Sequence, residues 1–179
     1  TPCGTLFPYT TLFRSIISGK AKGIDTAAHQ AALESGGTTI FVLPEGILNF
    51  RPNKEILKYM NDDNSLVLSE FWPTTKWFAN NAMQRNNTIC ALSDTVFLVE
   101  ASLEGGTFAT GKKCMEIGKP LAVADFTDDH PLHQGNTYFL KKGAVPFPAK
   151  KPNFEPLLQM VQTEKKPQNR NNQELLWDL

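Results

Sequence analysis

The stretch Ser18–His29, SGKAKGIDTAAH, decides the fold that the sequence predicts. It joins the end of a short apolar strand to a glycine-containing loop and then to the start of a helix. Gly19 and Gly23 allow tight turns and a close backbone approach to a ligand. The first N–H groups of the helix lack intrahelical partners, and with the helix dipole they favour phosphate. Because Lys20 and Lys22 lie in the same loop, the stretch predicts a phosphate-backbone or nucleotide site.

A second junction of the same kind follows in Arg85–Gly106, RNNTICALSDTVFLVEASLEGG. A buried strand again leads through glycines into a helix, so the two junctions are expected at the same edge of the sheet. The overlapping segment GTFATGKK fits the G-x-x-x-x-G-K part of a P-loop, but Lys113 stands where magnesium needs Ser or Thr. A P-loop NTPase is therefore rejected.

Strands alternate with helices along the chain, which predicts an α/β fold with a Rossmann-like parallel sheet flanked by helices. At 179 residues the chain has the length of a single domain with a C-terminal tail. We expect strands at 16–17, 38–43, 66–69, 95–100 and 120–124, and helices at 25–35, 53–60, 79–93, 107–117 and 135–143.

Several spaced motifs in this order resemble the DprA/Smf DNA-processing family. SGKAKGIDTAAHQAALESGGTTIFVLPEGI is similar to the family pattern S-G-x-A-R-G-I-D-x-x-A-H and its Gly-Gly-Thr strand. QRNNTICALSDTVFLVEASLEGGTFATGKKCMEIGKPLAV resembles the segment that opens on R-N-R-I-I-A-G-L-S. GNTYFLKKGAVP resembles the closing G-x-N-x-L-I-x-x-G-A, so the likeness covers about residues 16–146.

The resemblance implies a single-stranded DNA-binding protein that acts in natural transformation, protecting incoming strands and loading a RecA-type recombinase. It also implies a bacterial, cytoplasmic protein that forms a homodimer. Phosphate contacts carry little sequence information, so binding is expected to tolerate any sequence and to weaken with salt. The chain departs from the family at Asn87, which replaces the second Arg of R-N-R. The expected DNA- and phosphate-binding residues are Gly19, Lys20, Lys22, Gly23, Arg85, Asn86, Gly105, Gly106 and Thr107.

The alternative function is a nucleotide-binding sensor or nucleotide hydrolase of the same Rossmann-like superfamily. The related phosphoribohydrolase motif P-G-G-x-G-T-x-x-E is broken here, because Glu104, Phe108 and Lys112 replace its Pro, its third Gly and its catalytic Glu. The sequence also lacks the G-x-G-x-x-G dinucleotide fingerprint. No catalytic residues, cofactor or metal are therefore predicted, and the protein is not predicted to be an enzyme.

Other polar residues have simpler structural interpretations. His29, on a helix of small residues, is interpreted as a packed, hydrogen-bonded core residue, and Asp25 as a cap or loop-orienting carboxylate. The histidine- and aspartate-containing segment 126–136 is interpreted as a solvated loop rather than a zinc site. The aromatic segment 71–78, FWPTTKWF, suits base stacking, although a place in the core or at an interface is favoured.

The two ends of the chain are set apart from the domain. Residues 5–15, TLFPYTTLFRS, resemble a translated sequencing adapter, so 1–15 are expected to be a non-native scar. Residues 16–147 are then the DprA-like domain, which lacks the family's first strand, helix and G-S-R-like loop, and 148–179 are a mobile linker and tail. The formal net charge is zero, which excludes a global basic field. Three cysteines without C-x-x-C spacing indicate free thiols, and no apolar run approaches a membrane span.

Overall fold

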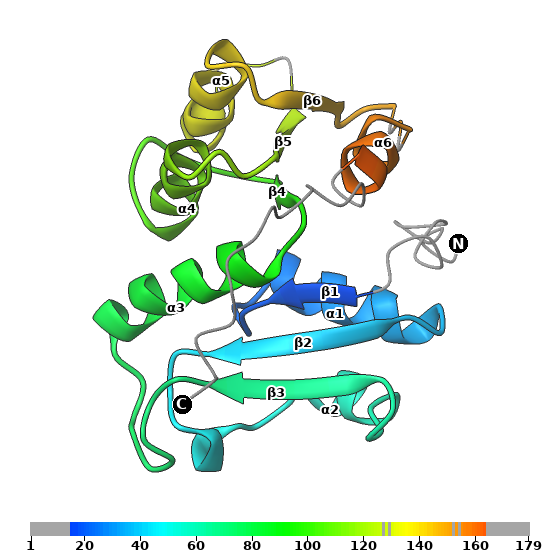
Figure 1. Cartoon of the computed structure of the whole chain (residues 1–179), viewed down its shortest axis with the longest axis vertical. Helices are drawn as coiled ribbons and strands as arrows, with labels where there is room; N and C mark the ends of the chain where they lie inside the picture. Colours follow the sequence, from blue (N-terminus) through cyan, green and yellow to red (C-terminus); the bar gives the residue numbers. More distant parts are fainter. Residues whose placement is uncertain (1–14, 127, 129, 152, 154, 164–179) are drawn as a thin grey trace, which may run out of the picture.

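Strands and helices alternate in the computed structural model, which describes residues 15–126, 128, 130–151, 153 and 155–163 (Figure 1). The first half contains β1 (Ser15–Ser18), α1 (Ile24–Glu34), β2 (Thr38–Leu43), η1 (Ile47–Asn49), α2 (Lys54–Leu57), β3 (Ser65–Ser69) and α3 (Ala79–Leu92). The second contains β4 (Val96–Leu98), α4 (Gly106–Glu116), β5 (Leu121–Asp125), η2 (Pro131–His133), α5 (Gln134–Lys141), β6 (Val145–Pro148) and α6 (Glu155–Thr163). The predicted α/β class is confirmed.

The strands form two three-stranded parallel sheets rather than the one sheet that was expected. The orders are β1-β2-β3 and β4-β5-β6, with Ile17 paired to Ile40 in the first sheet and Val96 to Leu121 in the second. Read from β3 to β1 and then from β4 to β6, the strands follow the order 3-2-1-4-5-6 of a doubly wound sheet. Here that sheet is interrupted between β1 and β4. In the described part of the chain no ladder joins these two strands. Instead α3 packs on β1 and β2 and also on α4, so it connects the two halves (Figure 1).

Each sheet has a hydrophobic core of its own. The first core joins Leu33 of α1 and Ile56 of α2 to Phe41 and Leu43 of β2. Phe41 and Leu43 face the same side of the sheet because alternate residues of a strand do so. The second core lies between the other sheet and its helices α3, α4 and α5. Its buried members are Cys90, Val96, Leu98, Cys114, Leu121, Val123, Phe139 and Ala144.

The expected linker after residue 147 is wrong in one respect, because part of it is an ordered helix. Leu157 of α6 is buried against Ala122 of β5 and Phe147 of β6. Leu157 and Met160, three residues apart, give α6 an apolar face that packs on the sheet. The polar composition of the segment obscured this face in the sequence. At the other end, Ser15 belongs to β1 and its hydroxyl hydrogen-bonds that of Thr38 at 2.7 Å. Residues 1–14 and 164–179 lie outside the described residues, and none of the described helices is long and apolar enough to cross a membrane.

Candidate nucleic-acid interface

The loop between β1 and α1 is held in shape by the first turn of α1. Gly23 precedes the helix with φ of 90° and ψ of −120°, a conformation that favours glycine. The Asp25 carboxylate accepts a hydrogen bond from the Ala21 N–H at 3.2 Å, and the Thr26 hydroxyl donates to the Ala21 carbonyl at 2.9 Å. Asp25 is therefore the loop-orienting carboxylate that was predicted.

His29 anchors the same loop from inside the core. Its side chain is fully buried, stacks on Phe41 at a centroid distance of 4.0 Å, and contacts the Gly19 carbonyl through Nε2 at 2.7 Å. Because a carbonyl only accepts, Nε2 carries a proton, while Nδ1 contacts the Thr39 hydroxyl, which also lies 3.0 Å from the Ile16 carbonyl. Burial lowers the pKa of His29 below its usual 6.5, so the neutral ring is favoured. The core interpretation of His29 is confirmed.

Arg85 of α3 lies directly on Gly19. A methyl group added at Gly19 would lie 2.0 Å from Nη1 of Arg85, so only glycine leaves room for the guanidinium. Arg85 is only 8% exposed, and among the described residues its Nε has no hydrogen-bond acceptor. Burial lowers the pKa of Arg85, while the nearby carboxylates of Asp25 and Glu45 oppose that shift. Among the residues that the structure describes, no carboxylate forms an ion pair with Arg85, so this buried cation beside the Gly19 backbone favours an incoming anion.

The two lysines of the loop differ in what they contact. Lys20 forms an ion pair with Glu45 at 3.1 Å, and its ammonium lies 5.6 Å from the centre of the Phe50 ring. Glu45 is buried and was not singled out from the sequence. Lys22 is exposed and, within the described residues, makes no hydrogen bond or ion pair.

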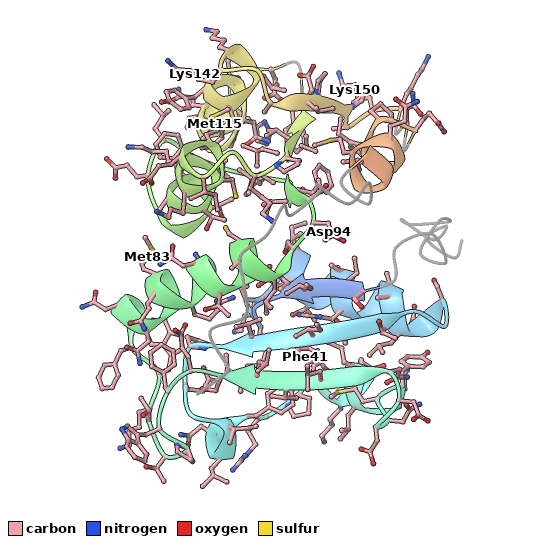
Figure 2. All side chains as sticks on the ribbon, viewed as in Figure 1. Phe41, Met83, Asp94, Met115, Lys142 and Lys150 are labelled. Carbon is pink, nitrogen blue, oxygen red and sulfur yellow. The ribbon has the colours of Figure 1, made fainter. Side chains whose placement is uncertain are left out.

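The second glycine loop approaches the same helix. Gly105 precedes α4 with φ of 90° and ψ of −175°, and the helix begins at Gly106. A methyl group at Gly106 would lie 3.5 Å from Nδ2 of Asn86 and 3.7 Å from Sδ of Met83, both on α3. Figure 2 shows Met83 on the side of α3 that faces α4. Thus α3 presents Arg85 to the first loop and Asn86 to the second, while Gly105 and Thr107 are exposed.

Asn136 was not identified from the sequence as a residue that shapes this edge, although it lies in the quoted GNTYFL motif. Its side-chain amide donates to the carbonyls of Val99 and Ala124, both at 2.8 Å, and accepts from the Ala101 N–H at 2.7 Å. The preceding residue, Gly135, has no room for a side chain, because a methyl group would lie 2.3 Å from the Ser102 carbonyl. These contacts fix the position of the chain where it leaves β4. The sequence feature that could have identified Asn136 is the Gly-Asn pair at the start of a helix.

The aromatic loop between β3 and α3 is not part of the core. Trp72, Trp77 and Phe78 are 83%, 61% and 58% exposed, so the core alternative for them is excluded. The loop is tied to η1 by hydrogen bonds, including Gly46 N–H to the Thr75 carbonyl at 2.8 Å. Base stacking and an interface both remain open for these side chains.

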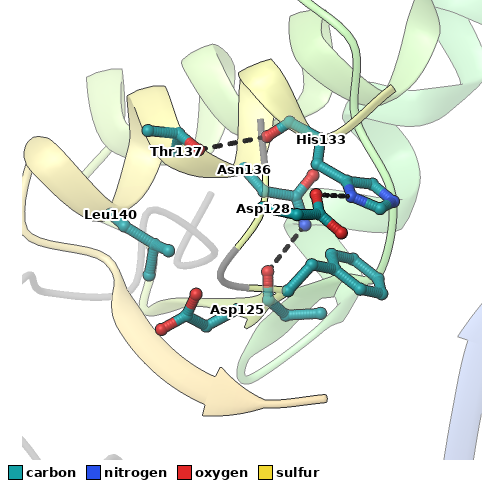
Figure 3. A pocket seen from close by; sticks show the side chains of 8 residues that line it. Asp125, Asp128, His133, Asn136, Thr137 and Leu140 are labelled. Atoms are coloured by element: carbon teal, nitrogen blue, oxygen red, sulfur yellow. Dashed lines mark hydrogen bonds and ion pairs between the residues drawn. The ribbon is translucent and has the colours of Figure 1, made fainter. Parts of the chain in front are cut away.

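A separate cavity of about 280 Å³ lies at the carboxyl end of β5 (Figure 3). On one side His133 stacks on Phe126 at 3.8 Å, hydrogen-bonds Asp128 through Nδ1 and lies 3.6 Å from the Glu100 carboxylate. His133 is thus held by neighbours rather than freely solvated as expected. The described residues contain no group of three or more histidines, cysteines or acids placed to hold a metal. The cavity is lined by Ala124, Asp125, Phe126, Asp128, His133, Asn136, Thr137 and Leu140.

Comparison with known sequences shows that this chain is similar to DNA-processing proteins. The sequence model of a family described as DNA recombination-mediator protein A matches residues 10–157. DNA processing protein DprA of Streptococcus pneumoniae is 37% identical over 131 residues, which are 72% of this chain and 46% of that protein. Protein Smf of Escherichia coli is 32% identical over 146 residues, 79% of this chain and 39% of that protein. The chain thus spans less than half the length of these relatives.

Solved structures agree with the sequences. An X-ray structure of DprA from Streptococcus pneumoniae has a TM-score of 0.70 at 32% identity and covers 87% of this chain and 53% of that one. A structure of DNA processing protein A from Helicobacter pylori, reported for its single-stranded DNA binding mode, has a TM-score of 0.66 at 25% identity. It covers 87% of this chain and 72% of that one. The family match begins within residues 1–15, and the division of the chain at 15/16 and 147/148 stays a prediction.

Proposed function

Because the chain belongs to the DNA recombination-mediator protein A family, which includes the DprA and Smf proteins, we propose that it binds single-stranded DNA. The binding surface is the cradle formed by the β1–α1 loop, the part of α3 that carries the buried Arg85 and the half-buried Asn86, and the β4–α4 loop. The observation that carries the proposal is Arg85, a buried cation on Gly19 whose Nε has no acceptor among the described residues.

The cradle suits a chain of phosphates better than one isolated phosphate. Two eleven-residue helices, α1 and α4, begin on either side of α3, and each offers unpaired N–H groups after a glycine. Arg85 lies against Gly19 at the end of β1, and Asn86 lies near Gly106 at the start of α4. Lys22 adds an exposed charge that has no ion pair within the described residues. A phosphate backbone that crosses α3 would meet both helix starts in turn. The contacts read no base, so binding is sequence-tolerant.

We further propose a binding module without catalysis. His29, the histidine nearest to the cradle in the sequence, is fully buried behind Gly19 with both ring nitrogens engaged, so it is not placed to reach a bound strand. The wider role is proposed from the family resemblance: protection of strands and loading of a RecA-type recombinase in natural transformation, as a homodimer in the cytoplasm. The relatives that support this role are longer than this chain.

Anisotropy titration of a labelled oligothymidylate tests the proposal. Arg85→Ala is expected to weaken binding at least tenfold, since hydrogen bonds to a charged group contribute about 1.5–3 kcal/mol. Arg51→Ala is the matched control, because Arg51 is exposed and its hydrogen bonds within the described residues go to the Leu48 and Phe50 carbonyls. Thermal unfolding of both variants separates lost binding from lost folding.

A mononucleotide titration of the same proteins distinguishes the alternative. Tight mononucleotide binding, together with oligonucleotide affinity that Arg85→Ala leaves unchanged, would replace the DNA-binding proposal with a nucleotide sensor.

A further inference from the structure

Two buried cysteines meet where α3 packs on α4. Cys90 of α3 and Cys114 of α4 are 1% and 0% exposed, and both are free thiols. Their sulfur atoms lie 3.3 Å apart. A disulfide bond is about 2.05 Å long, so the sulfurs need to approach by little more than about 1 Å. The two residues come from different helices, so a bond between them would restrain the helices relative to each other.

The surroundings of the two thiols make them chemically unequal. The contact with Cys114 and the charges of Lys119 and Lys113 lower the pKa of Cys90 to about 7, against the opposing effect of burial. The same contact, with burial, raises the pKa of Cys114. Cys90 is therefore the better nucleophile near neutral pH, because the thiolate is the reactive form. Cys114 stays protonated and lies in position to resolve an oxidised Cys90.

We propose that Cys90 and Cys114 form a dithiol that peroxide oxidises to a disulfide, and that this bond locks α3 to α4 and weakens binding at the cradle. The Cys90 thiolate and one proton react with hydrogen peroxide to give the sulfenic acid and one water. The Cys114 thiol then displaces the second water and forms the S–S bond. Each sulfur loses one electron, and the peroxide oxygens accept both. Because the oxidant must reach a buried pair, a molecule of nearly the size of water is required.

The position of the pair connects it to the cradle, and this part of the inference rests on the proposed function. Cys90 follows Arg85 and Asn86 by about one turn of α3, and Cys114 lies on the helix that begins at Gly106. No strand ladder joins the two sheets in the described residues, so the α3–α4 contact is a principal connection between the halves. Drawing the sulfurs together pulls Asn86 towards Gly106 and narrows the space between the helix starts.

Peptide mapping of the full chain tests the chemistry. After treatment with hydrogen peroxide, alkylation of remaining thiols and digestion with trypsin, residues 86–112 should be linked to residues 114–141 through Cys90 and Cys114. The Cys3→Ser variant should give the same linked pair, while Cys90→Ala and Cys114→Ala should not. Oxidation of Cys90 without the linked peptide, or linkage only after denaturation in urea, would overturn the proposal.

Two further measurements test the lock. The oxidised protein should unfold at a higher temperature than the reduced protein, because a cross-link restricts the unfolded chain. It should also bind oligothymidylate at least threefold more weakly, with full recovery on adding dithiothreitol, and Cys114→Ala should not respond. A linked peptide with unchanged unfolding and affinity would refute the lock. If the reduced protein fails to bind the oligonucleotide, the DNA-binding proposal fails, whereas peptide mapping and unfolding still decide the disulfide.

Discussion

The two strand–loop–helix junctions begin from the same kind of sequence and have different surroundings. In both, a glycine with φ of 90° precedes an eleven-residue helix. The first loop is anchored from the core, because Gly19 is buried, its carbonyl accepts from His29 and Arg85 covers its Cα. The second loop has exposed glycine at Gly105 and a surface bond from the Ser102 hydroxyl to the Glu104 carbonyl.

This difference indicates that the two junctions contribute differently to binding at the cradle. The first junction holds a desolvated cation in a fixed position, so it should supply most of the binding energy. The second offers helix-start N–H groups without a cation in the first turn of α4, so it should guide the strand at lower energy. Both predicted loops are present. A buried side chain anchors each of them, His29 the first and Asn136 the second, but only the first holds a buried cation, Arg85.

Removing the core anchor should have the largest effect. His29→Ala deletes a buried ring and leaves the Gly19 carbonyl without its partner, so it should destabilise the protein by about 3 kcal/mol. Ser102→Ala, which removes only a surface bond of the second loop, should cost less than about 0.5 kcal/mol because that bond is exposed. Urea unfolding of both variants measures the difference. Equal costs would show that the two loops are anchored alike.

Substituting one glycine in each loop, Gly19 or Gly106, should lower the affinity for oligothymidylate by different amounts. Gly19→Ala places a methyl group against the guanidinium of Arg85, which must move, so oligothymidylate affinity should fall about tenfold, or about 1.4 kcal/mol. Gly106→Ala meets only ordinary contacts and replaces a helical glycine, so it should leave affinity within about twofold and not lower stability. Anisotropy titrations check both. A larger loss of affinity for Gly106→Ala would mean that the second loop, not the first, supplies most of the binding energy.

Lowering the pH should destabilise the protein through His29, which anchors the first junction. The pKa of His29 is lowered in the folded protein, so the unfolded chain binds the proton more readily below pH 6.5. Stability should therefore fall as pH decreases from 6.5, with a slope of at most about 1.4 kcal/mol per pH unit from this residue. Unfolding of the wild type and of His29→Gln between pH 7 and 5 isolates the contribution. Identical slopes would contradict a neutral His29.

The two lysines of the first loop should show the smallest effects. Lys22→Ala should weaken binding about threefold and reduce the slope of log affinity against log salt by about 0.7, the value for one phosphate contact on a single strand. Lys20→Ala should change the salt slope less, because Glu45 already pairs Lys20. Titrations between low and moderate salt compare them. A steeper change for Lys20 would mean that the ion pair opens on binding.

Local patterns predicted most elements and both loops. Strand 38–43 is observed as expected, helix 79–93 appears as Ala79–Leu92, and His29 is buried as its small-residue helix indicated. The break between β1 and β4 was not predictable in this way, because pairing between distant strands leaves no local periodicity. The contacts of Arg85 with Gly19 and of Lys20 with Glu45 were missed for the same reason. Each depends on a partner brought near by the fold.

The amide resonances of the two loops give the most direct test of the central claim, that both glycine junctions and α3 form one cradle for a phosphate chain. Labelled protein would be titrated with oligothymidylate while the signals of residues 19–23, 85–86 and 105–107 are followed. We predict that all three groups shift with one common affinity, and that the first group shifts most. Binding that leaves both loops unperturbed, or that shifts them with different affinities, would contradict the account.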